Sequence, residues 1–196
     1  KDLLDYAMSH RDKCKEFFNT IESIFKQCKE KDIEAAKIDF FDLANELSEK
    51  IISLPPFEAQ QTDQDFLLRG LMNLLSLVFT QKPNIKDEIL SKSQPNLLQN
   101  ILHNCLFEIP STVVEKGVIP GPKCKNKESR KAALQLLQSM TAGTNQFTLE
   151  TLRYFKKLIL HNFWRTKQNS DWCIVPVHAE KPKGGYVGLE NLGCTC

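Results

Sequence analysis

Apolar residues recur at intervals of three and four positions through this chain as far as about Lys167. This spacing is typical of amphipathic helices. Prolines and glycines interrupt the pattern, most clearly at Pro55-Pro56, Pro83 and Gly143, where a helix must end. The pattern therefore predicts an all-α region over residues 1–167, built from successive antiparallel helices with short connections.

The interruptions set the bounds of the predicted helices. They are residues 2–28, 32–54, 62–82, 84–91, 95–107, 127–142 and 149–165, with a Pro- and Gly-rich loop over 109–125. Thr62 and Thr148 are the expected N-caps of the third and last helices, and Pro95 is expected in the first turn of its helix. The third helix is apolar nearly all round, so we expect it at the centre of the fold. The last helix should bury a stripe of Leu152, Phe155, Ile159 and Phe163.

Two architectures fit this series of helices. Short links between antiparallel helices are typical of an armadillo- or HEAT-like array. No clean repeat period accompanies them, so a plain helical bundle remains the alternative.

Charge and cysteine usage narrow the function classes. A net charge of +2 does not indicate binding to the negatively charged backbone of a nucleic acid. The apolar run over 66–79 is too short and too polar to span a membrane. The basic cluster over 123–131 is expected to be a solvated face. Seven irregularly spaced cysteines favour reduced thiols in the cytoplasm, with the nucleus as a second compartment. Too few ligands surround Cys194-Thr-Cys196 for zinc, and we expect no metal and no cofactor.

The composition changes after Lys167. Residues 168–184 are expected to be an extended linker, because a polar stretch, a short apolar run and a Pro/Gly/Lys segment follow one another there.

The last residues, 185–196, end in Gly188-Leu-Glu-Asn-Leu-Gly-Cys-Thr-Cys196. This stretch resembles the cysteine box that opens the papain-like catalytic domain of ubiquitin-specific proteases, Gly-Leu-x-Asn-x-Gly-x-Thr-Cys. Six defined positions agree: Gly188, Leu189, Asn191, Gly193, Thr195 and Cys196.

The resemblance implies a thiol protease that hydrolyses isopeptide bonds at the C-terminal glycine of ubiquitin. It aligns Cys196 with the nucleophile and Asn191 with the side chain of the oxyanion hole. The residue types suit that chemistry, because a thiolate is the attacking species and the oxyanion needs donors already in place. The implied partners are ubiquitin and ubiquitinated proteins, with further protein partners on the helical region. Cys194 departs from the family, which usually has Asn or Ala there.

A weaker resemblance lies upstream. Residues 122–137 are similar to a segment that precedes the catalytic domain in the very large fat-facets-like members. The chain opens at Lys1 rather than Met and ends inside the cysteine box, so we expect a segment of a longer protease. In the family the general-base His and its orienting Asn or Asp follow the box, so we expect this segment to be inactive alone. The histidines present, His10, His103, His161 and His178, are expected to be surface or core residues. The alternative function is a helical partner-binding scaffold in a non-catalytic homologue.

Overall fold

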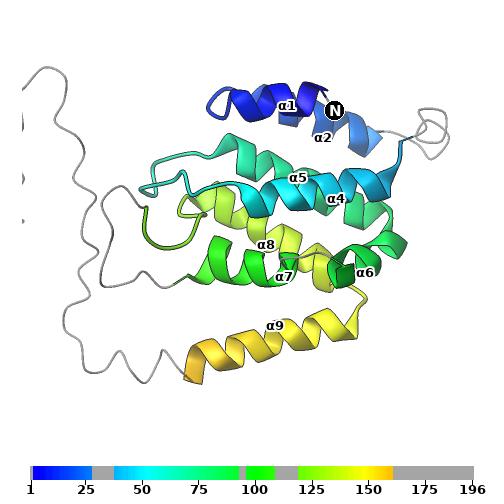
Figure 1. Ribbon diagram of the computed structural model, residues 1–196, viewed down its shortest axis with the longest axis vertical. Coiled ribbons are helices and arrows are strands. Elements are labelled where there is room, and N and C mark those ends of the chain that lie inside the picture. The colour runs from blue at the N-terminus through cyan, green and yellow to red at the C-terminus, as the bar shows by residue number, and fades with distance from the viewer. Residues whose placement is uncertain (1, 28–37, 93–95, 109–118, 161–196) are drawn as a thin grey trace, which may run out of the picture.

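The computed structural model describes residues 2–27, 38–92, 96–108 and 119–160. Every regular element in these ranges is helical, which confirms the all-α prediction for them. The helices lie in layers, from α1 and α2 at one end to α9 at the other (Figure 1). Their bounds are α1 Asp2–Ser9, α2 Lys15–Gln27, α4 Phe40–Ser53, α5 Phe66–Gln81, α6 Pro83–Lys92, α7 Leu97–Asn100, the π-helical segment η1 Ile101–Phe107, α8 Lys127–Thr141 and α9 Asn145–Leu158.

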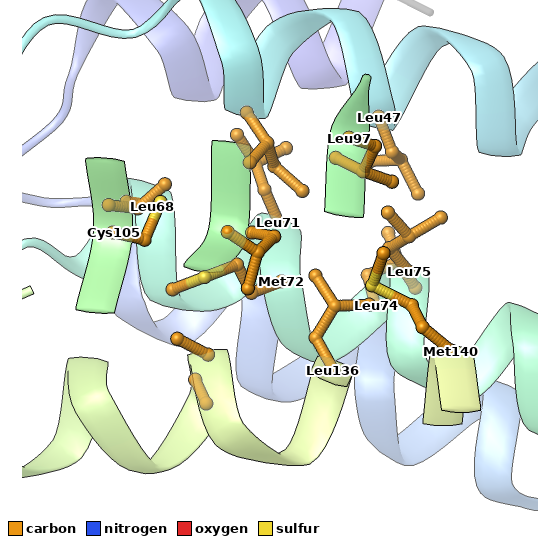
Figure 2. Packing of buried hydrophobic residues seen from close by; sticks show 14 of the residues in the cluster. Leu47, Leu68, Leu71, Met72, Leu74, Leu75, Leu97, Cys105, Leu136 and Met140 are labelled. Atoms are coloured by element: carbon orange, nitrogen blue, oxygen red, sulfur yellow. The ribbon is translucent and has the colours of Figure 1, made fainter. Parts of the chain in front are cut away.

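Helix α5 is the centre of the fold, as its apolar sequence predicts. It packs against α8, α2 and α4, and five of its six leucines are buried, with Leu77 partly exposed. Figure 2 shows Leu136 and Met140 of α8 beside Leu74 and Leu75 of α5. The small residue Gly70 lets α2 approach closely, because a Cβ there would lie 2.1 Å from Cγ of Phe18.

Several predicted helix starts are wrong. Helix α5 begins at Phe66, where Asp65 is the cap and accepts from the amide of Leu68, so Thr62 lies outside it. Helix α4 begins at Phe40 behind the cap Asp39, so it starts later than the predicted helix over 32–54, of which residues 32–37 lie outside the described residues. The predicted first helix is two helices, because the chain turns over residues 10–14 between α1 and α2.

The second half follows the prediction more closely, with two exceptions. Helix α8 buries its predicted face, and Gly143 lies just past its end with a φ of +73°. Helix α7 begins at Leu97 behind the cap Asn96, and Pro95 lies outside the described residues. Helix α9 begins at Asn145, earlier than the predicted Thr148 cap.

The predicted stripe of α9 is wrong at Leu152 and Ile159. Phe147 and Thr151 are buried, whereas Leu152 and Ile159 are each 57% exposed. Phe155 is half-buried against the core and Phe163 lies outside the described residues.

Neither the armadillo- or HEAT-like arrangement nor the papain-like start is tested by these elements, and both stay predictions. The predicted boundaries at 167/168 and 184/185 lie outside the described residues.

Candidate functional site

The two predicted catalytic side chains, Cys196 and Asn191, lie outside the described residues, as does the whole segment 161–196. The described helices therefore do not place either of them. What the structure does place is the polar chemistry of the helical region, which includes a buried carboxylate hub, a pair of buried thiols and two surface grooves, one between α2, α5 and α8 and a larger one beside α9.

Glu58 forms the hub. It follows Pro55-Pro56 in the α4–α5 connection and is fully buried. One carboxylate oxygen accepts from the amide of Asp65 at 3.2 Å. The other accepts from the amides of Lys125 and Asn126 at 2.6 and 2.7 Å, and from the Ser129 hydroxyl at 2.9 Å. Four donors compensate for the loss of hydration of the buried charge and tie the segment before α8 to the start of α5.

The basic cluster is a solvated face only in part, which corrects the prediction. Lys127, Arg130 and Lys131 are exposed, but Lys123 is buried and donates from Nζ to the carbonyls of Ile51 and Ile52 at the end of α4. Lys125 is partly buried and donates to the Glu58 carbonyl at 2.8 Å. Burial lowers the pKa of both lysines. The free carbonyls at a helix C-terminus attract a cation, which explains the inward turn of Lys123.

The described cysteines are packing groups rather than nucleophiles. Cys105 and Cys124 are fully buried and joined by a backbone hydrogen bond of 3.1 Å. The hydrogen bond from Cys105, followed by burial, raises the pKa of the Cys124 thiol, and burial raises the pKa of Cys14. The same hydrogen bond lowers the pKa of the Cys105 thiol. All three described thiols are nevertheless buried, and a thiol that a substrate cannot reach is a poor nucleophile.

An open groove of about 680 Å³ lies between η1 and α9. The wall formed by α7 and η1 carries polar residues at positions 96, 99, 100, 103 and 104, beside Leu98 and Leu102. This helical spacing is present in the sequence, but the sites predicted from the sequence did not include it. Its α9 side carries Glu150, Arg153, Tyr154 and Lys157.

His103 Nδ1 lies 3.4 Å from the Tyr154 hydroxyl, whose pKa is raised by burial. The imidazole thus contacts a neutral phenol and no thiol. The groove suits polar recognition, and short π-helical segments of the η1 kind are frequent at functional sites.

Two other kinds of site are missing from the same described ranges. Every helix there is too short or too polar to cross a membrane. Nor do His, Cys, Asp and Glu side chains gather there in the groups of three that a metal ion needs.

The chain is similar to very large ubiquitin hydrolases. Over 93% of its length it is 29% identical to ubiquitin carboxyl-terminal hydrolase puf of Drosophila melanogaster, and 29% and 28% identical to ubiquitin carboxyl-terminal hydrolase 34 of Homo sapiens and Mus musculus. It spans only 4% to 5% of the length of these relatives. The chain matches no protein-family model and no solved structure.

Proposed function

We propose that this chain is part of a deubiquitinating thiol protease of the ubiquitin-specific protease family, in the large fat-facets-like subgroup. Two observations support the proposal. The chain is similar to ubiquitin carboxyl-terminal hydrolases over 93% of its length. Its last residues also match six defined positions of the family's cysteine box. The similarity to the hydrolases carries most weight, because it does not depend on a short motif.

In this proposal Cys196 is the nucleophile. Its thiolate attacks the carbonyl carbon of the C-terminal glycine of ubiquitin, and the amide of Asn191 donates to the oxyanion that forms. Collapse of the tetrahedral intermediate expels the lysine amine with a proton and leaves a thioester on Cys196. Water then releases ubiquitin and the free thiol. The proton transfers require a His from the sequence that follows the cysteine box in the family.

The helical region supplies no part of this chemistry in the proposal. The thiols that the structure describes are buried, and the imidazole of His103 in the groove contacts Tyr154. Its role is a rigid scaffold ahead of the catalytic domain, with the η1–α9 groove as a surface for ubiquitinated proteins or other partners. The reduced thiols fit action in the cytoplasm or nucleus.

Hydrolysis of a fluorogenic ubiquitin C-terminal amide by the full-length protein tests the proposal. Cys196→Ala should abolish turnover, whereas the matched control Cys194→Ala should keep it. Residues 1–196 alone should show none, because in the family the general-base His follows the cysteine box. Turnover that survives in Cys196→Ala would refute the assignment. An inactive but well-folded full-length protein would instead favour a partner-binding scaffold, for which the polar groove is the specific support.

A further inference from the structure

The η1–α9 groove has a charged wall. Glu150, Arg153 and Lys157 of α9 stand three and four residues apart along the groove, so they share one face of the helix. They span about 10 Å, with the carboxylate at one end and the cations at the middle and the other end. Arg153 and Lys157 are exposed, and neither is paired with a carboxylate of the described residues. Two cations are therefore available to a ligand.

The facing wall offers hydrogen bonds instead of fixed charges. Among the described residues that line it there is no Asp, Glu, Lys or Arg, and its polar groups include Gln99, His103 and Asn104. Because η1 is π-helical, one turn takes more residues than in an α-helix, so His103 and Asn104 both lie about one turn beyond Gln99. Side-chain amides both donate and accept, so this wall can pair with the N–H and the C=O groups of an extended main chain.

The dimensions of the groove suit a short extended segment. About 10 Å of wall matches three residues of extended chain at about 3.3 Å each. A volume of about 680 Å³ leaves room for their side chains. Leu98 and Leu102 also line the groove and are buried, so one apolar side chain of the segment can find an apolar contact.

We propose that the η1–α9 groove binds an extended peptide segment with carboxylate side chains from a protein partner. The carboxylates lie against Arg153 and Lys157, and the main chain lies against the amides of Gln99 and Asn104. This inference rests on the partner-binding role proposed above for the groove and specifies the chemistry of the partner. A guanidinium group can hold a carboxylate through two parallel hydrogen bonds.

Glu150 sets the direction of the charge pattern and argues against a nucleic acid. A carboxylate at the Glu150 end of the groove would be repelled, so the acidic residues belong at the Lys157 end. A peptide can carry its charges at one end only. A nucleic-acid strand carries a charge on every phosphate and would have to bring one past Glu150.

Fluorescence anisotropy with residues 1–196 and rhodamine-labelled peptides tests the proposal. The probes are Gly-Ser-Leu-Ser-Asp-Asp-Gly and the reversed order Gly-Asp-Asp-Ser-Leu-Ser-Gly, because either chain direction can bring the carboxylates to Lys157. The control peptides have Asn in place of Asp. At least one acidic probe should bind with a Kd below about 1 mM, and its Asn counterpart should bind about tenfold more weakly or worse.

Substitutions on α9 should change the affinity in opposite directions. Arg153→Gln should weaken binding of the acidic probe by about three- to tenfold, because it removes a charge-assisted pair. Glu150→Gln should strengthen binding by about twofold, because it removes a like charge. General damage to α9 would not produce opposite effects. The matched control is Lys131→Gln on α8, which is exposed and does not line the groove, so it should leave the Kd unchanged.

Several results would overturn the proposal. One is the absence of binding to either acidic probe up to about 1 mM. Others are equal binding of the Asp and Asn peptides, or an unchanged Kd in Arg153→Gln. A labelled oligothymidine that binds more tightly than the acidic probes would point to a nucleic-acid site instead. The assay measures no turnover, so a negative result leaves the assignment of Cys196 standing, and an inactive Cys196 leaves this test standing.

Discussion

Gly70→Ala is the substitution that tests the packing at the centre of the fold most sharply, because two opposing effects act on it. In a helix interior, alanine is favoured over glycine by about 1 kcal/mol. Here, however, the new Cβ would lie 2.1, 2.4 and 2.6 Å from three ring atoms of Phe18. Those atoms include Cγ, which rotation about χ2 does not move, so relief requires either a χ1 change of a buried ring or a shift of α2 away from α5.

Overpacking of this kind costs roughly 1–3 kcal/mol, and more when the backbone must shift, so the clash outweighs the gain in helix propensity. We expect Gly70→Ala to destabilise the chain by about 1–2 kcal/mol. For a chain of this size this lowers the melting temperature by about 2–8 °C. Urea and thermal unfolding measure the effect.

A double-mutant cycle with Phe18→Ala assigns the cause. With the ring removed, Gly70→Ala should become neutral or stabilising, since only the propensity term remains. A stabilising Gly70→Ala in the chain with Phe18 intact would show that α2 does not approach α5 as described.

Three further predictions rest on buried polar groups. Glu58→Gln replaces one acceptor by a donor that faces amide N–H groups, and urea unfolding should show a loss of about 1–3 kcal/mol. Arg11→Met leaves the buried carboxylate of Asp65 without its cation and should lower the free energy of unfolding by about 3 kcal/mol in the same assay. Lys50 pairs with Asp5, whose side chain is 58% exposed, so Lys50→Met should lower it by under about 1 kcal/mol. Equal losses in those two variants would contradict the description of the Arg11 pair. Burial lowers the pKa of Lys123 in the folded chain, so the unfolded chain binds more protons above that lowered pKa. The free energy of unfolding should therefore rise with pH from the lowered pKa toward about 10.4, the usual lysine pKa. Unfolding measured at a series of pH values should show a smaller rise for Lys123→Met.

The helices could be predicted from periodicity because burial of one face is a local signal. Helix α8 and the central position of α5 follow directly from it. The caps failed because several suitable residues stand close together and tertiary contacts choose among them. Asp65, for example, both caps α5 and holds Arg11, which also explains why the chain turns between α1 and α2.

Other errors came from information that no local pattern carries. Helix α9 has apolar residues on both sides of Phe147, and the sequence alone does not say that Phe147 and Phe155 meet the core while Leu149 and Leu152 are exposed. Lys123 was expected in water because its partners, the carbonyls of residues 51 and 52, are far away in sequence. The Glu58 hub was missed for the same reason, since its donors come from residues 65, 125, 126 and 129. The cysteine box was found from a short motif and stays a prediction.

Covalent capture tests the central claim most directly. A ubiquitin probe with an electrophile at its C-terminus should modify the full-length protein, and peptide mapping by mass spectrometry should locate the adduct on Cys196. The Cys194→Ala protein should be labelled equally, and the Cys196→Ala protein should not be labelled. An adduct on any other cysteine, or labelling that persists without Cys196, would contradict the account.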